Sequence, residues 1–346
     1  MNETHKKNWV NKRKARKQNL QPDDLFAALI SDDRSALSSS ITLLESTLDS
    51  DQIKGRALVE KSLPHAGQAI RIGITGVPGV GKSTFIEAFG LYLISLGKKL
   101  AVLAVDPSSE EGEGSILGDK TRMYKLSQAE NAFIRPSPSA KNLGGVARKT
   151  RESILLCEAA GYDVILIETV GVGQSETMVH SMVDFFLLLM LAGAGDELQG
   201  IKRGIMELAD LLVINKADGD NLKKSELAAR EYKNAMHLFP VNANEWIPKT
   251  AVCSALENKN IDTIWKEIES FQNQTKVNGW FDKKRKSQDL RWFNGSLKET
   301  ILHHYLDQKG AKASVQEFEK KIIDQEITPF EAAEILFKKW INDKSV

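Results

Sequence analysis

A glycine-rich loop between two apolar segments is the feature that most constrains how this chain can fold. Residues 70–75 before the loop are strand-like, and residues 84–89 after it are compatible with a helix. The loop matches the pattern G-x-x-x-x-G-K-[ST] at every fixed position. It reads Gly76-Val77-Pro78-Gly79-Val80-Gly81-Lys82-Ser83. A strand, this loop and a helix in that order predict a phosphate-binding loop.

The residue types in this loop have physical reasons. Glycines let the backbone approach closely enough for its N–H groups to face phosphate oxygens, and the dipole of the following helix favours negative charge. We expect Lys82 to bridge the β- and γ-phosphates and the Ser83 hydroxyl to bind Mg²⁺. The loop therefore predicts a nucleoside triphosphate site with a magnesium ion.

The apolar runs predict an α/β fold with a mostly parallel sheet flanked by helices. They are short and separated by helix-like or loop segments, which is typical of strands buried on both faces. We expect strands at residues 70–74, 100–105, 164–167, 185–191 and 211–214.

Helical spacing of apolar residues dominates both ends of the chain. Residues 23–63 predict a helical lead-in, and residues 290–305 carry apolar side chains spaced 3, 4, 4 and 4. Ser314 with Glu317, and Thr328 with Glu331, resemble capping boxes that open two further helices. With 346 residues, we expect a helical extension over residues 1–68, a nucleotide domain over 69–281 and a helical arm over 282–346.

A second motif, Asn215-Lys216-Ala217-Asp218, follows the apolar run 211–214 and matches the N-K-x-D pattern of guanine-binding proteins. The Asp218 carboxylate can accept hydrogen bonds from guanine N1–H and the exocyclic amine, whereas adenine presents an acceptor at N1. We expect Asn215 to brace the loop and Lys216 to lie along the base with its aliphatic stem. The loop Cys253-Ser254-Ala255 resembles the one whose backbone N–H groups contact guanine O6.

Three acidic residues near strand ends are candidate magnesium ligands. Asp106 and Asp119 follow the second apolar run, and Glu168 ends the run 164–167. Carboxylates at the carboxyl ends of parallel strands point to the ligand crevice, and Mg²⁺ prefers oxygen ligands. The alternative for each is a helix-capping or solvated acid. Gln174 is a candidate for orienting the attacking water, because Val172 stands where many regulatory GTPases carry glutamine.

Composition excludes several other classes of protein. Lys and Arg number 47 against 46 Asp and Glu, so no chain-wide positive charge suggests nucleic acid or an anionic membrane. The apolar run 185–191 is far shorter than a bilayer span. Two cysteines, Cys157 and Cys253, make no disulfide framework or zinc site and fit a reducing compartment, so the cytoplasm is expected. The basic segment 6–17 fits a solvated tail or a helix start, and a mitochondrial transit peptide stays open.

Taken in order, the motifs closely resemble one family. They are GVPGVGKST, DPSS, GDK, ETVGVGQSE, AGAGDELQGIKRGIMELAD, NKAD and CSAL. The family is the MeaB-type GTPases, also labelled ArgK, whose human relative is the methylmalonic aciduria type A protein. ETVGVGQSE and DELQGIK are far more specific than the phosphate loop alone.

The resemblance implies a P-loop fold of the SIMIBI class, a homodimer formed through the C-terminal helices and a chaperone role for an adenosylcobalamin-dependent acyl-CoA mutase. It places a third switch around residues 195–202. We expect coupling to the partner there through Asp196, Glu197, Gln199 and Lys202. The implied GTP contacts are Gly76, Val77, Pro78, Gly79, Val80, Gly81, Lys82, Ser83, Thr84, Asp218, Cys253, Ser254 and Ala255, to which the N-K-x-D motif adds Asn215 and Lys216.

Two alternative functions stay open on the sequence. One is an ATPase or kinase linked to amino-acid transport, which Asp218 disfavours. The other is a metal-insertion GTPase, which normally needs Cys or His clusters, whereas here the six histidines are scattered. Which mutase is the partner, methylmalonyl-CoA, isobutyryl-CoA or a related enzyme, also stays open.

Overall fold

The computed structural model describes residues 21–105, 123–136, 143–169, 175–193, 203–240, 243–306 and 310–342. The chain divides into two compact units, residues 1–285 and residues 286–346. The first unit holds the sheet and the helices around it, and the second is helical.

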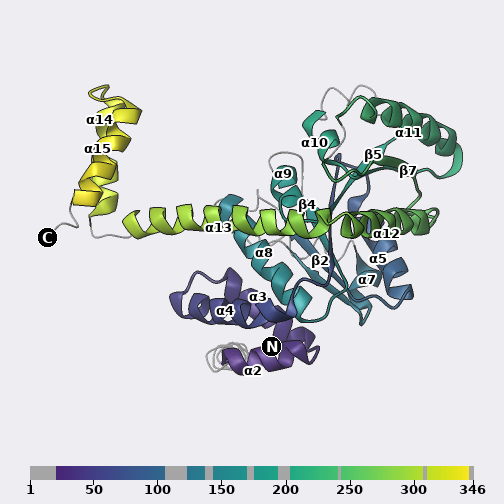
Figure 1. The fold of residues 1–346 in the computed structure, drawn as a ribbon, viewed down its shortest axis with the longest axis horizontal. Helices are drawn as coiled ribbons and strands as arrows, with labels where there is room; N and C mark the ends of the chain where they lie inside the picture. Colours follow the sequence, from purple (N-terminus) through teal and green to yellow (C-terminus); the bar gives the residue numbers. More distant parts are fainter. Residues whose placement is uncertain are drawn as a thin grey trace, which may run out of the picture. The chain divides into compact units, whose positions relative to one another are not determined.

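A seven-stranded parallel sheet forms the centre of the first unit, in the order β3-β2-β4-β1-β5-β6-β7 (Figure 1). Because β1 lies in the middle, the loop that follows it emerges at the centre of the sheet's carboxyl edge. The strands are β1 (Ile70–Gly76), β2 (Leu100–Val105), β3 (Ala132–Arg135), β4 (Val164–Thr169), β5 (Phe185–Leu191), β6 (Leu211–Asn215) and β7 (Lys249–Val252).

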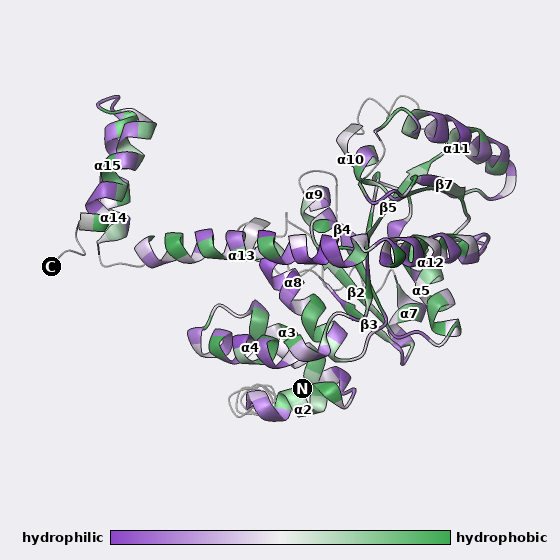
Figure 2. Ribbon diagram, in the orientation of Figure 1, coloured by the Kyte–Doolittle hydropathy of each residue, from purple (hydrophilic) through white to green (hydrophobic). Residues whose placement is uncertain are grey.

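Both faces of the sheet are covered by helices, so alternate residues of one strand enter two different cores. In β2, Leu100 and Val102 face one core, while Ala101 and Leu103 face the other. The central strands β2, β4, β5 and β6 are accordingly mostly apolar (Figure 2), as expected for a parallel sheet buried on both sides. The structure confirms the α/β fold predicted from the sequence.

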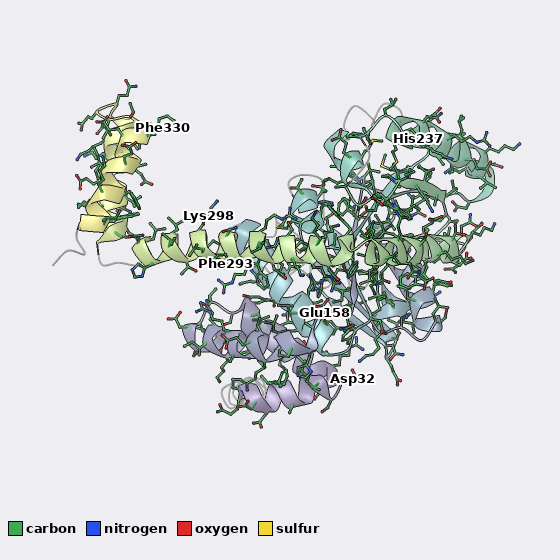
Figure 3. The ribbon with its side chains drawn as sticks, in the orientation of Figure 1. Asp32, Glu158, His237, Phe293, Lys298 and Phe330 are labelled. Atoms are coloured by element: carbon green, nitrogen blue, oxygen red, sulfur yellow. The ribbon has the colours of Figure 1, made fainter. Side chains whose placement is uncertain are left out.

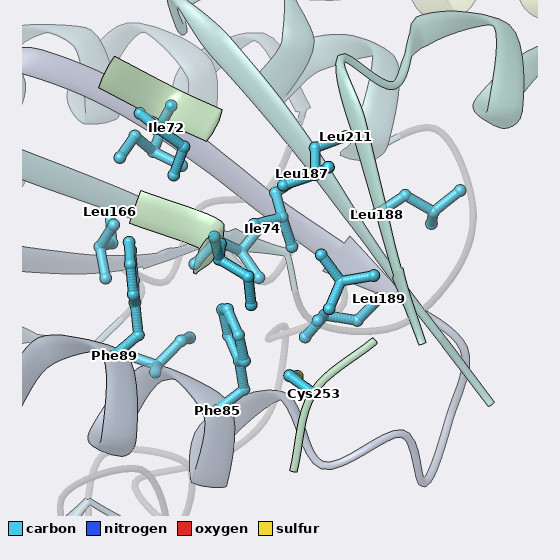
Figure 4. Packing of buried hydrophobic residues seen from close by; sticks show 14 of the residues in the cluster. Ile72, Ile74, Phe85, Phe89, Leu166, Leu187, Leu188, Leu189, Leu211 and Cys253 are labelled. Carbon is cyan, nitrogen blue, oxygen red and sulfur yellow. The ribbon is translucent and has the colours of Figure 1, made fainter. Parts of the chain in front are cut away.

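The first core contains the helix that begins at the glycine-rich loop. Phe85 and Phe89 of this helix stack with ring centroids 5.5 Å apart and lie in the same cluster as Ile74 and Leu166 (Figure 4). Helices on this side and at the edge are α5 (Lys82–Ser95), α7 (Tyr124–Gln128), α10 (Arg203–Leu208), η3 (Gly219–Asn221), α11 (Leu222–Met236) and α12 (Ile261–Val277).

The second core contains the predicted helical lead-in, which is confirmed as three helices. Asp33 caps the second of them by accepting hydrogen bonds from the N–H groups of Ser35 (2.7 Å) and Ala36 (3.2 Å). The elements around this core are α2 (Pro22–Ile30), α3 (Arg34–Glu45), α4 (Asp49–Ser62), η1 (Leu63–His65), α8 (Leu143–Ala159) and α9 (Ser175–His180).

The apolar runs of the sequence predicted five of the seven strands and missed β3 and β7. Each of these is only four residues long. The first two residues of β7, Lys249 and Thr250, are polar, so this segment shows no continuous apolar run. The two missed strands, β3 and β7, are the first and the last in the strand order of the sheet.

The amino edge of the sheet is held by a buried ionic network. Arg285 donates hydrogen bonds to both carboxylate oxygens of Asp184 (2.8 and 2.6 Å) and to the carbonyl oxygens of Gly67 and Ala69 (both 2.6 Å). Arg71 donates two hydrogen bonds to Glu158 (both 2.9 Å), which Figure 3 labels. The start of the final long helix is thereby fixed to β1 and β5.

The hydrogen-bond partners of Asp184 keep its carboxylate ionised. Burial alone would raise the pKa of Asp184, but the hydrogen bonds and charges of Arg285 and Arg71 outweigh burial and hold this pKa below its usual value. A lowered carboxyl pKa stabilises the folded state above about pH 4, and this stabilisation is lost as the pH falls through the folded-state pKa.

The described residues of the second unit form three helices: α13 (Trp280–Leu306, which begins in the first unit), α14 (Ala311–Ile323) and α15 (Pro329–Asn342). Thr328 caps α15 as predicted, because its hydroxyl accepts a hydrogen bond from the Glu331 N–H (3.2 Å). The predicted cap at Ser314 is wrong: α14 begins three residues earlier, after Gly310 in a left-handed conformation. Tyr305 stacks on Trp340 with centroids 5.6 Å apart.

None of the helices in the described part of the chain combines the length and apolar composition needed to cross a bilayer.

We predict that Arg285→Met lowers the free energy of unfolding by about 3–5 kcal/mol at pH 7, because Asp184 then stays buried without its main partner. Urea unfolding measures this loss, with Lys286→Met on the exposed neighbouring residue as the control. The difference from the unaltered chain should shrink as the pH falls from 7 to 3, because the pKa of Asp184 is higher without Arg285 and protonation then removes the unpaired charge. A loss that is the same at pH 3 and pH 7 would contradict the ionic explanation.

Candidate functional site

Two glycines shape the loop between β1 and α5, each for a different reason. Gly76 is paired with Leu189 of β5, and a Cβ atom on Gly76 would lie 2.5 Å from the Leu189 carbonyl oxygen. Gly81 precedes α5 with a φ of 86°, in the left-handed region. A side chain is therefore excluded by contact at the first position and by backbone conformation at the second.

Lys82, the first residue of α5, turns back over this loop. Its Nζ donates a hydrogen bond to the Gly76 carbonyl oxygen at 2.9 Å. Burial lowers the pKa of Lys82, and the nearby negative charges of Glu168 and Glu176 act in the opposite direction. The loop thus presents an ammonium group and the N-terminus of a 14-residue helix at one place, which is a favourable arrangement for a phosphate.

Glu168 is buried near the carboxyl end of β4, and its neighbour Thr169 links this end to β1. The Thr169 hydroxyl donates a hydrogen bond to Thr75 Oγ1 (2.8 Å), and both side chains are buried. Since Thr75 directly precedes Gly76, the strand carrying Glu168 is joined to the strand that carries the phosphate loop.

The buried side-chain amide of Asn215, at the end of β6, connects three loops. Its Nδ2 donates to the Val80 carbonyl oxygen (2.9 Å). Its Oδ1 accepts hydrogen bonds from the Ala255 N–H (3.2 Å) and from the Cys253 thiol (3.5 Å). The phosphate loop, the N-K-x-D segment and the loop after β7 are therefore brought together, as the sequence motifs predict for a guanine nucleotide site.

Lys216 and Asp218 lie on the open side of this junction. Lys216 has a φ of 59°, and its Cε lies 3.7 Å from the position that a Cβ atom on Gly81 would take. The Asn221 side chain fixes the turn by donating to the Lys216 carbonyl oxygen (2.7 Å). Asp218 is partly exposed, so its carboxylate is accessible to a base.

The loop after β7 is closed by a short antiparallel bridge between Ser254 and Lys259. Ser254 Oγ also accepts a hydrogen bond from the Glu257 N–H (3.2 Å). Hydrogen bonding and charge from Glu257 raise the pKa of Lys259, and the charge of Asp218 adds to this effect. A cation thus lies near the residue predicted to read the base.

Several predicted residues lie outside the described part of the chain. The magnesium candidates Asp106 and Asp119, the water-orienting candidate Gln174 and the third-switch residues are in this group, so their roles stay predictions. The third-switch residues are Asp196, Glu197, Gln199 and Lys202. Among the described loop residues, Pro78, Gly79 and Thr84 are exposed, while Val77 and Val80 are buried.

The described donors fit magnesium by their chemistry. Ser83 offers a hydroxyl oxygen and Glu168 a carboxylate beside the phosphate loop, and both are hard ligands. Within the described residues, no three His, Cys, Asp or Glu side chains form a metal-binding group.

The sequence motifs assigned no role to two residues of the site, Glu176 and Lys259. Glu176 is completely buried at the start of α9, and its charge acts on Lys82. Glu176 is the last residue of the ETVGVGQSE segment. The length and specificity of that segment were a signal that further residues in it, beyond Glu168 and Gln174, contribute to the site. Lys259 carries no motif signal, because only folding brings it near Asp218.

Comparison with known proteins places this geometry in a family. The model of the family described as methylmalonyl-CoA mutase-associated GTPase MeaB matches residues 37–310. GTPase ArgK of Escherichia coli is 50% identical over 272 residues, covering 79% of this chain and 82% of that protein. The mitochondrial methylmalonic aciduria type A homolog of Mus musculus is 43% identical over 326 residues, covering 91% of this chain and 79% of that protein.

A solved structure has the same fold. The crystal structure of an LAO/AO transport system kinase superposes with a TM-score of 0.73 at 38% identity, covering 92% of this chain and 96% of the other. The parallel sheet with its phosphate loop is thus a P-loop nucleotide-binding fold.

We predict that Asp218→Asn weakens GTP binding by about a hundredfold or more, because the amide cannot accept both hydrogen bonds from guanine. The same variant should gain affinity for xanthosine triphosphate, which carries a carbonyl in place of the exocyclic amine. Equilibrium binding of both nucleotides measures the change, with the exposed Asp220→Asn as the control. Unchanged GTP affinity in Asp218→Asn would refute the guanine assignment.

Proposed function

Because the chain belongs to the family of methylmalonyl-CoA mutase-associated GTPases, we propose that it couples GTP hydrolysis to cofactor loading, protection or reactivation of an adenosylcobalamin-dependent acyl-CoA mutase. The chain is a GTPase, a hydrolase that converts GTP to GDP and phosphate. The observation that carries the assignment is the junction at Asn215, where the phosphate loop and the two base-reading loops meet.

In the proposed mechanism, the chain binds and orients the nucleotide before the partner acts. Lys82 leaves the Gly76 carbonyl for the β- and γ-phosphates, and the N–H groups of the loop take the remaining phosphate oxygens. Ser83 and Glu168, with Asp106 and Asp119 as predicted further ligands, would hold Mg²⁺, which neutralises charge that develops on the phosphates. Gln174 orients the attacking water, and Asp218 selects guanine.

We expect slow hydrolysis by the chain alone and faster hydrolysis with the mutase. Val172 replaces the glutamine that orients water in many regulatory GTPases, and partner-supplied ordering raises turnover by orders of magnitude elsewhere. The third switch at residues 195–202 is the proposed route by which the mutase and the nucleotide affect each other. The proposed location is the cytoplasm, or the mitochondrial matrix for a eukaryotic chain.

One alternative is favoured by a specific observation. The solved structure that superposes with a TM-score of 0.73 is that of an LAO/AO transport system kinase, so an ATPase or kinase linked to amino-acid transport is the second candidate function. Turnover of ATP at a rate comparable to that of GTP would favour this second candidate. A metal-insertion role is less suitable, since the described residues hold no cluster of metal-binding side chains.

We predict that Lys202→Ala and Gln199→Ala bind GTP almost normally but lose the stimulation of GTP hydrolysis by the mutase, because the loop would transmit the partner's effect without holding the nucleotide. GTP turnover with and without methylmalonyl-CoA mutase and isobutyryl-CoA mutase measures this, with the exposed Lys223→Ala of α11 as the control. Stimulation that is intact in both variants would refute the role of the loop, and absence of stimulation of the unaltered chain would refute the mutase partnership.

A second copy of this chain is also a proposed partner, and α13 supplies the argument for a homodimer. Leu290, Phe293, Leu297 and Ile301 follow one another at helical spacing, and their side chains are between 45% and 65% exposed. Figure 3 labels Phe293 on this helix and Phe330 on α15, which is 85% exposed. An apolar row of this length favours a second copy of the same surface as its occupant.

We predict that Phe293→Glu converts the dimer to a monomer, because a charge in a self-complementary apolar contact is repeated on both copies. Light scattering after gel filtration measures the mass, and Asn294→Glu introduces the same charge on the neighbouring position as the control. A dimer that persists in Phe293→Glu would place the contact elsewhere.

A further inference from the structure

The thiol of Cys253 contacts the amide that joins the nucleotide loops. Its Sγ lies 3.5 Å from Asn215 Oδ1, on the side opposite the hydrogen bond from Nδ2 to Val80. We propose that Cys253 is a positioning residue of the nucleotide site, whose thiol holds the Asn215 amide in its bridging orientation and so slows release of the bound nucleotide. The proposal rests on the assignment of this junction to the base of GTP.

The two ends of an amide side chain are chemically different, so the orientation of Asn215 matters. In the observed orientation, Nδ2 donates to the Val80 carbonyl oxygen and Oδ1 accepts from two donors, the Ala255 N–H and the Cys253 thiol. A flipped amide would place its NH₂ group against both donors and its oxygen against the Val80 carbonyl. Asn215 is only 1% exposed, so water could not repair these contacts.

The backbone of Cys253 fixes the direction of its side chain. Its N–H donates to the Ile214 carbonyl oxygen (2.9 Å), and its carbonyl oxygen accepts from the Ala217 N–H (3.0 Å). The side chain enters the same core as Phe85 and Leu189 (Figure 4). Both the strand pairing and the core therefore hold the sulfur toward Asn215.

The thiol is a hydrogen-bond donor at physiological pH. Burial raises the pKa of Cys253 to about 12, so the sulfur keeps its proton. A thiol is a weaker donor than a hydroxyl. The Cys253 thiol is nevertheless a second donor to Asn215 Oδ1, beside the Ala255 N–H. The position of this oxygen decides whether the amide Nδ2 reaches the phosphate loop.

In this proposal, the nucleotide leaves when the phosphate loop and the two base loops separate. The Asn215 side chain is bonded to both the phosphate loop and the loop after β7, so a loosened amide lowers the barrier to their separation. The global fold depends much less on this contact, because the strands around Asn215 keep their ladder hydrogen bonds. The thiol should therefore affect nucleotide release more than stability.

The experiment compares two variants that differ in one hydrogen-bonding group. Cys253→Thr and Cys253→Val have the same shape, but only threonine can donate to Asn215. Release of a fluorescent GDP analogue, chased with excess GDP, should be about five- to tenfold faster in Cys253→Val than in Cys253→Thr. If the larger side chains prevent folding, Cys253→Ser and Cys253→Ala provide the same comparison without extra volume.

Cys157 supplies the matched control. It is the other buried cysteine and lies in α8, in the core on the opposite face of the sheet. Cys157→Thr and Cys157→Val should release the analogue at equal rates. Equal release rates in the two Cys253 variants would overturn the proposal, and so would a Thr/Val difference at Cys157 as large as that at Cys253.

The test of the Cys253 thiol and the assignment of the site to guanine can fail independently of each other. If the unaltered chain held ADP as tightly as GDP, the assignment to guanine would fail. The Thr/Val comparison with the fluorescent ADP analogue would still decide whether the thiol positions Asn215, because that amide bonds to the phosphate loop whichever base is bound.

Discussion

The close approach of β1 and β5 at Gly76 is the constraint on which the site depends. The Leu189 carbonyl oxygen occupies the space that a Cβ atom on Gly76 would need, at 2.5 Å. This contact lets the central strand end directly against its neighbour, and the loop then turns into α5. Phe85 and Phe89 anchor that helix in the core below. The packing of β1 against β5 and of α5 against the core thus sets the position of the phosphate loop.

The amino and carboxyl ends of the parallel strands are stabilised by different kinds of interaction. At the amino edge, Arg285 and Arg71 form hydrogen-bonded ion pairs with Asp184 and Glu158. At the carboxyl edge, the junction at Asn215 consists of neutral hydrogen bonds from an amide, a backbone N–H and a thiol. Ion pairs with little solvent access are costly to break. The neutral hydrogen bonds at Asn215 cost less to open, because no buried charge is left unpaired. This difference suits an edge that must admit and release a nucleotide.

Much of the fold and of the site could be predicted from the sequence, because long apolar runs and fixed motif spacings carry strong local signals. The phosphate loop and the N-K-x-D segment are of this kind. The prediction missed β3 and β7 because a strand of four residues is too short to show a periodic pattern. The predicted cap at Ser314 failed because Gly310, with its positive φ, begins the helix one turn earlier. Contacts between residues far apart in the chain could not be predicted from the sequence. Only the structure shows the Cys253 thiol against Asn215 and the charge of Glu176 near Lys82. No spacing rule connects positions this far apart in the chain.

The charges around Lys82 bear on how a triphosphate could be held. One partly buried ammonium group, that of Lys82, lies near two buried carboxylates, Glu168 and Glu176. The described part of the loop's surroundings therefore offers less positive charge than the motif alone suggests. Adding a polyanionic triphosphate to such a site without a further cation would be electrostatically unfavourable. A divalent ion held in part by Glu168 would turn that carboxylate from a repulsive neighbour of the phosphates into a ligand. The two carboxylates near Lys82 would thus favour binding of nucleotide and metal together.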